Sequence, residues 1–248
     1  LMYFASKRLK EFKLPAKLKP RFEKLNTLID ESNLATNSSL PGDDTTVALY
    51  PLDWLSANIL VKSLQRYGQN ERSLFSFLSD YSKFSIGKST TDFYSVPDVF
   101  DYLINTLPSE INGPENPHKP QWHSTFRALE RAELIFGDDF STASEVIKTI
   151  GLVNIFARAG GEFNSTFITG YFKTIRKVDV SDILLKLEKS GITRFYRHRN
   201  KINFLEGTDI DLEQELIRIS KEVNSKFAIS RELPSLISFP LLMVKKYT

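Results

Sequence analysis

Apolar side chains recur at three- and four-residue steps along most of the chain, the spacing that gathers them on one face of an α-helix. The clearest stripe is in 121–136, where aromatic and aliphatic residues alternate with polar ones. A stripe that wide is typical of a helix that faces a hydrophobic core, and we interpret its aromatic residues as core. The pattern predicts helices over 21–34, 53–67, 71–80, 96–107, 121–136, 140–158 with an interruption at Gly151, 165–174 as a short helix or extended turn, and 212–227.

The pattern changes in 178–213. Ile183, Leu184 and Leu187 share one helical face, and Ser190-Gly191 is a typical helix end. Two short runs rich in β-branched and aromatic residues, 192–196 and 202–205, then flank a basic, polar turn, which predicts a β-hairpin. A helix, a glycine stop and a hairpin in this order are typical of the second half of a winged helix.

Turn-forming residues divide the chain. The stretch 35–46 consists almost wholly of them, and Gly160-Gly161 ends the helical pattern that precedes it. We also expect a short extended entry at 47–50, a polar loop at 82–92 and a connection rich in Pro and Gly at 108–120. We therefore predict a mainly α protein, a helical bundle followed by a winged-helix domain with a β-hairpin. The expected parts are an N-terminal helical segment and linker at 1–46, a helical lid-like domain at 47–160, and a winged-helix domain with a C-terminal helical extension at 161–248.

Composition narrows the class of protein. The 248 residues are 41% hydrophobic and 25% charged, which is ordinary for a globular protein, and 33 basic against 30 acidic residues leave a net charge of only +3. Such a balance does not indicate general attraction to nucleic acid. Cysteine is absent, no signal peptide opens the chain, and no apolar run reaches the roughly 20 residues of a membrane helix, so we expect a cytoplasmic protein with no membrane partner. Both ends resemble cut ends, and we expect a fragment of a larger protein.

Several possible catalytic or metal-binding patterns are incomplete. Ile86-Gly87-Lys88-Ser89-Thr90 resembles a phosphate loop, but such a loop requires a glycine five residues before the Gly-Lys pair, where Ser82 stands. The histidines share no metal-ligand spacing, and no Ser/His/Asp order is better than chance. We therefore expect no catalytic residue and no metal ligand within this chain.

Basic residues concentrate around the predicted hairpin. Between Lys173 and Lys201 there are nine Lys or Arg residues and three acids, an excess of six. In winged-helix proteins the hairpin tip can lie along the phosphate backbone, so these cations are candidates for DNA contact. Two observations favour a protein-packing role instead: charged residues also protect exposed strand edges, and acids follow directly after the hairpin. The candidate DNA-contact residues are Arg194, Arg197, His198, Arg199 and Lys201.

Two segments carry a resemblance to a known family. The first segment consists of Tyr50-Pro51-Leu52, a helix that ends in Arg66-Tyr67-Gly68, and the run Gln69-Asn70-Glu71-Arg72-Ser73-Leu74-Phe75-Ser76-Phe77-Leu78. It resembles the lid of large bacterial P-loop ATPases of the AAA+/STAND kind. These proteins are related to origin-recognition and phage-defence ATPases. Arg197 and 205–211 are similar to the winged-helix part of the same family.

The resemblance implies a role for the lid. In that family a lid arginine senses the γ-phosphate region of the nucleotide, and this role would fall on Arg72, with Glu71 and Asn70 shaping the turn. ATP and Mg²⁺ would be bound by the parent protein, because this chain has no Walker A or Walker B segment. The chain also departs from the family at Asp53, where members often have a histidine.

The expected function is thus that of a region that follows an ATPase core of the same polypeptide. It would couple the nucleotide state to a winged helix that binds DNA or a protein partner, without being catalytic itself. One alternative is a stand-alone winged-helix DNA-binding regulator, in which Arg72 is merely structural. Another is a non-catalytic protein-interaction scaffold.

Overall fold

The computed structural model describes residues 13–35, 46–68, 71–79 and 92–205, together with the single residues Leu9, Phe84 and Ile86. Residues 1–205 form one compact unit, to which all of the following applies. The predicted helix 212–227, the acidic residues after the hairpin and most of the two loops at 35–46 and 82–92 lie outside the described residues.

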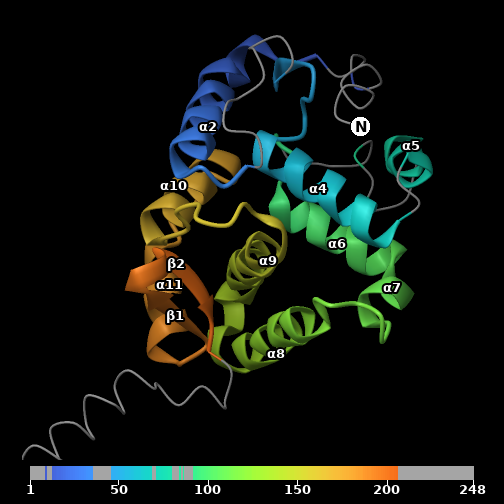
Figure 1. Cartoon of the computed structure of the whole chain (residues 1–248). Helices are drawn as coiled ribbons and strands as arrows, with labels where there is room; N and C mark the ends of the chain where they lie inside the picture. The colour runs from blue at the N-terminus through green and yellow to red at the C-terminus, as the bar shows by residue number, and fades with distance from the viewer. Residues whose placement is uncertain are drawn as a thin grey trace, which may run out of the picture. The chain divides into compact units, whose positions relative to one another are not determined.

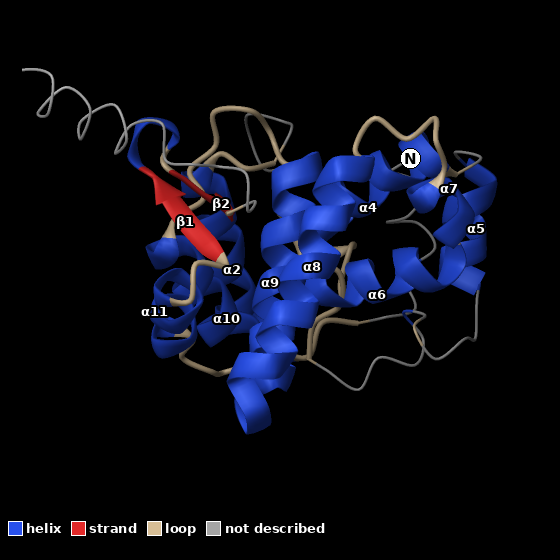
Figure 2. Ribbon diagram, turned by 90° about the horizontal axis from the view of Figure 1, so that it is seen from below, coloured by secondary structure: helices blue, strands red, loops and turns tan. Residues whose placement is uncertain are grey.

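The described chain is mainly helical and carries a two-stranded antiparallel sheet late in the sequence, which confirms the predicted class at this level (Figures 1 and 2). Its helices and strands are α2 (Lys19–Ser32), α4 (Trp54–Tyr67), α5 (Glu71–Ser79), α6 (Val96–Thr106), α7 (Pro108–Asn112), α8 (Lys119–Phe136), α9 (Phe140–Phe156), α10 (Ser165–Ile175), α11 (Ser181–Lys189), β1 (Thr193–Tyr196) and β2 (Lys201–Phe204).

Helix α9 is the element around which the others are arranged. It packs against α8, α6, α4 and β2, and Figure 1 shows it near the middle of the molecule. This central position follows from its sequence, because apolar residues occupy nearly every turn of the helix on several sides. Its fully buried side chains include Val146, Ile147, Ile150, Leu152 and Val153.

Gly151 allows α8 and α9 to approach closely. The sequence pattern predicts an interruption there, and this prediction is wrong, because α9 runs through the glycine without a break. A Cβ atom at position 151 would lie 2.6 Å from Oγ1 of Thr125 on α8. The glycine therefore serves the contact between the two helices and not the end of a helix.

Two other local expectations differ from the structure. Residues 47–50, expected as an extended entry, form helical and turn structure instead. The stretch after α6, expected as a loop, begins with the short helix α7, whose Pro108 occupies the first turn, where the missing N–H costs nothing. The segment 165–174, expected as a short helix or an extended turn, is helical as α10.

The two strands pair with Thr193 opposite Phe204 and Phe195 opposite Ile202. A third extended position joins them: the N–H of Phe163 donates to the carbonyl of Asn200 (3.0 Å), and the N–H of Ile202 donates to the carbonyl of Phe163 (2.8 Å). We call residues 140–205 the helix–hairpin unit. In chain order it consists of α9, the bridging Phe163, α10, α11, β1 and β2.

Contacts cross the predicted domain boundary at Gly160-Gly161. The N–H of Glu162 donates to the carbonyl of Ser32 (2.8 Å) across this boundary. Just before the boundary, the N–H of Arg158 donates to the carbonyl of Leu34 (2.8 Å). Helix α10 packs along α2. The helix–hairpin unit therefore packs against α2 and the residues that follow it. The division into domains at 160/161 stays a prediction.

Candidate nucleic-acid interface

The hairpin turn brings together the cations that the sequence singles out. Arg197, His198 and Arg199 form a single turn of 3-10 helix between β1 and β2, and all three side chains are exposed. Arg194 and Lys201 share one face of the strands, because Arg194 lies two residues before Tyr196 and Tyr196 pairs with Lys201. The five predicted DNA-contact residues thus belong to one end and one face of the hairpin.

This turn is held at its base. Asn200 adopts a left-handed conformation (φ 46°), which asparagine tolerates better than most residues, and its N–H donates to the carbonyl of Arg197 (3.2 Å). Its carbonyl accepts the N–H of Phe163, and its side-chain oxygen lies 3.5 Å from Nδ2 of Asn164, the residue that caps α10. The turn is therefore tied to the start of α10 and not merely to its own strands.

The charges of the turn are uniformly positive. No acidic residue occurs between Gly191 and Leu205. Among the described residues, neither Arg197 nor Arg199 forms an ion pair. Lys201 differs, because burial, and to a lesser extent the charge of Arg199, lowers the pKa of its ammonium group. The two arginines are thus exposed and without an ion pair among the described residues, whereas Lys201 is half-buried.

The predicted nucleotide-sensing residues are only partly described. Glu71 and Arg72 are the first two residues of α5, and their side chains lie outside the description, as does Asn70 altogether. Further along the helix, Leu74 and Phe77 are buried in the core. The sensing role of Asn70, Glu71 and Arg72 stays a prediction.

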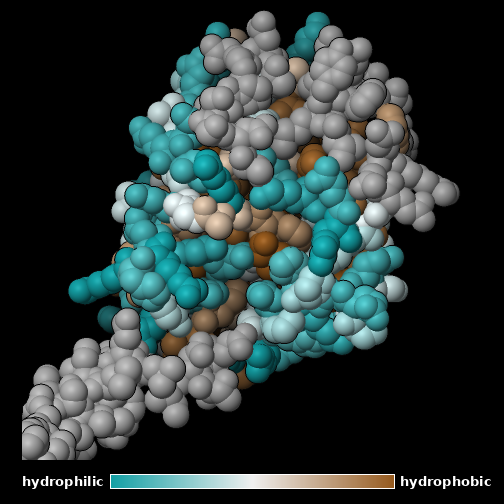
Figure 3. Space-filling model, viewed as in Figure 1, coloured by the Kyte–Doolittle hydropathy of each residue, from teal (hydrophilic) through white to brown (hydrophobic). Residues whose placement is uncertain are grey.

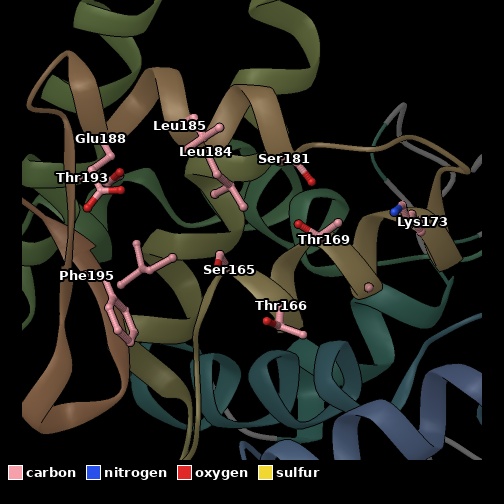
Figure 4. Close-up of a pocket in the computed structure, with 12 residues that line it drawn as sticks. Ser165, Thr166, Thr169, Lys173, Ser181, Leu184, Leu185, Glu188, Thr193 and Phe195 are labelled. Atoms are coloured by element: carbon pink, nitrogen blue, oxygen red, sulfur yellow. The ribbon is translucent and has the colours of Figure 1, made fainter.

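A groove of about 690 Å³ lies between α10, α11 and β1. Figure 4 shows Thr166 and Thr169 of α10 on one side and Leu184 and Leu185 of α11 on the other, with Lys173 toward one end. This groove is not among the features predicted from the sequence. Its polar wall has a signal in the sequence, however, since Ser165, Thr166, Thr169, Gly170 and Lys173 recur at helical spacing opposite the apolar face of α10.

The outer surface also divides into polar and apolar regions. In Figure 3 the end of the molecule that carries the hairpin is largely hydrophilic, and apolar residues gather nearer the middle of that face. Within the part of the chain that the structure describes, no group of three or more His, Asp or Glu side chains is placed to hold a metal ion. No described helix combines the length and the apolar character that crossing a bilayer would need.

Comparisons of the chain with protein-family models, with curated proteins and with solved structures find no match.

Proposed function

We propose that this chain is the non-catalytic region that follows the core of an AAA+/STAND-like ATPase, and that its helix–hairpin unit is a winged helix that binds duplex DNA. The link to an ATPase rests on the resemblance of 50–78 to the lid of that family. The order of helix, bridging residue, two helices and hairpin supports the winged-helix assignment. DNA is the partner that the exposed charges favour.

The observation that carries the DNA-binding proposal is the exposed turn Arg197-His198-Arg199. Two arginines without an acidic partner among the described residues stand at the tip of a hairpin whose base is fixed. An arginine guanidinium can donate two parallel hydrogen bonds to a phosphate, and a turn that is already ordered loses little conformational entropy on binding. These properties suit contact with a phosphate backbone.

The test is DNA binding by the 248-residue chain at several salt concentrations. Each phosphate neutralised by a cation adds about 0.9 to the slope of log affinity against log salt. We therefore expect a salt-dependent affinity in the unchanged chain, and a slope lower by about 2 in the variant Arg197→Ala/Arg199→Ala. Adding Lys201→Ala should change the slope less than either arginine, because that lysine is half-buried.

Two outcomes would contradict the proposal: no salt-dependent binding, or binding that the arginine variant leaves unchanged. The first would favour a protein-interaction scaffold. Circular dichroism and thermal unfolding of each variant serve as the control, since an exposed turn should tolerate alanine without loss of fold.

The proposed role of Arg72 needs a different test. In a polypeptide that also carries the ATPase core, Arg72→Ala is expected to lower ATP hydrolysis without changing the affinity of the hairpin for DNA. Arg66→Ala, near the end of α4, is a matched control on the neighbouring helix. Equal hydrolysis in all three proteins would leave Arg72 a structural residue.

A further inference from the structure

We infer that α11 stays outside the major groove and that the hairpin alone carries the DNA contact, so that the chain binds the phosphate backbone without sequence preference. This inference rests on the proposed DNA binding and goes beyond it. In helix-turn-helix proteins the second helix lies in the major groove, and residues near its N-terminus contact the base edges. Helix α11 has the corresponding place in the chain, and its surface does not suit that role.

The exposed face of α11 has no net charge. Its exposed side chains are two acids, two lysines, one serine and one leucine, namely Ser181, Asp182, Leu185, Lys186, Glu188 and Lys189. Asp182 is in the first turn, where a base-reading helix would meet the DNA most closely. A carboxylate there would face the phosphates that line the groove, and that repulsion disfavours insertion.

Three cations in or around α11 already contact other groups of the protein. The ammonium of Lys186 lies 4.6 Å from the centre of the Phe136 ring on α8. Arg131, also on α8, donates from Nη2 to the carbonyl of Ser190 at the end of α11 (3.0 Å). Lys173 pairs with Asp179 just before the helix (2.7 Å). Of the basic groups near α11, these three are already engaged.

The hairpin has the opposite character, since the exposed residues of its tip are cations with no acid among them. Asparagine and glutamine are the side chains that recognise adenine in the major groove. Asn203 is the exposed asparagine of the strands, and its side-chain oxygen accepts from Nδ2 of Asn154 (3.1 Å) and from the N–H of Phe204 (2.9 Å). With that amide oxygen occupied, Arg197 and Arg199 remain. Arginine can also read guanine in the major groove, but with α11 outside that groove the hairpin tip meets the phosphate backbone, which is the same for every sequence.

Two variants with the same change of charge test this inference. Arg197→Ala/Arg199→Ala removes two positive charges from the hairpin, and Leu185→Glu/Lys189→Ala lowers the charge of α11 by the same amount. Leu185 is 53% exposed and Lys189 is exposed, so the second variant is expected to fold. We expect the hairpin variant to bind a 20-base-pair duplex at least tenfold more weakly than the unchanged chain, and the α11 variant to bind it within about threefold.

A second measurement tests sequence preference directly. The 248-residue chain is used to select from a pool of random duplexes, and the bound fraction is sequenced. We expect no enriched motif. An enriched motif, or an α11 variant that loses as much affinity as the hairpin variant, would overturn the inference and leave DNA binding itself intact. Absence of salt-dependent binding in the unchanged chain would overturn both.

Discussion

The phenol of Tyr171 donates a 2.7 Å hydrogen bond to the carboxylate of Asp53, a residue 118 positions earlier in the chain. Both side chains are fully buried. Asp53 caps α4 by accepting from the N–H of Ser56 (2.8 Å), and the phenol oxygen accepts from the N–H of Val96 at the start of α6 (3.1 Å). One phenol therefore joins α4, α6 and α10.

This relationship gives Asp53 a structural role. Its carboxylate accepts from the hydroxyl of Ser56 (2.7 Å) as well as from the backbone N–H of that residue (2.8 Å). A buried carboxylate is costly unless its oxygens are satisfied, and three donors satisfy this one. The cap and its partner on α10 thus account for an aspartate at this position.

Replacing Tyr171 with phenylalanine should destabilise the chain. The substitution keeps the ring, which stacks on Phe167, and removes the hydroxyl that Asp53 needs. A hydrogen bond to a charged group contributes about 2 kcal/mol, so we expect the free energy of unfolding in urea to fall by about that amount. In an Asp53→Asn background the same substitution should cost less, because the side chain that loses the hydroxyl of Tyr171 then carries no charge. Equal costs in the two backgrounds would contradict an interaction between the two side chains.

The stability difference between the unchanged chain and Asp53→Asn should depend on pH. Burial raises the pKa of Asp53, and the hydrogen bonds from Ser56 and Tyr171 offset this only in part. In the unfolded chain an aspartate has a pKa of about 3.9. As pH falls, Asp53 is therefore protonated in the folded chain before it is protonated in the unfolded chain. The unchanged chain should gain stability relative to Asp53→Asn between the raised pKa and about pH 4, and lose that gain as pH rises again.

Urea unfolding of both proteins at a series of pH values and constant ionic strength measures this difference. A difference that stays constant would mean that the pKa of Asp53 is the same in the folded and unfolded chains. A trend of the opposite sign would mean that the three hydrogen bonds outweigh burial.

The contact between α8 and α9 can be tested at Gly151. In Gly151→Ala the new methyl group would lie 2.6 Å from Oγ1 and 2.7 Å from Cγ2 of Thr125. Overpacking of this kind costs about 1–3 kcal/mol, more than the roughly 1 kcal/mol that alanine gains over glycine in a helix. We expect a net loss of stability in thermal unfolding. Adding Thr125→Ala removes both clashing atoms and should restore it; failure to do so would place the strain elsewhere.

The sequence predicts the helices well where the apolar spacing is long and regular, as in α8 and α9. It fails at Gly151, because a glycine inside a helix has the same local signal whether it ends the helix or admits a neighbour. The short α7 is missed for a related reason, since five residues give too little periodicity. In each case the deciding information belongs to another segment of the chain.

The candidate site shows the same division. The cations of the hairpin are found from the sequence because they are adjacent in it, whereas the groove beside them depends on how α10 packs against α11. The engagement of Lys186 with Phe136 is likewise invisible in the sequence, since those residues are on different helices. A local excess of charge therefore predicts where cations are, but not which of them are available.

Arg176 at the end of α10 provides the last prediction. Its guanidinium donates from Nε to Glu145 on α9 and from Nη2 to Asp98 on α6, both at 2.9 Å, and only 12% of the side chain is exposed. Burial alone would lower its pKa, but the charges of Asp98 and Glu145 outweigh burial and raise it. Arg176→Met keeps most of the apolar stem and leaves two carboxylates facing each other.

Removing one partner of a buried ion pair costs about 3–5 kcal/mol. Because both carboxylates here are partly exposed, we expect Arg176→Met to lower the free energy of unfolding in urea by about 3 kcal/mol. The double variant Arg176→Met/Glu145→Gln should lose less than Arg176→Met alone, because one of the two facing charges is gone. Strictly additive losses would show that repulsion between Asp98 and Glu145 is not the cause. Arg176 takes no part in the proposed DNA contact. DNA affinity measured below the unfolding temperature should therefore not change in either variant.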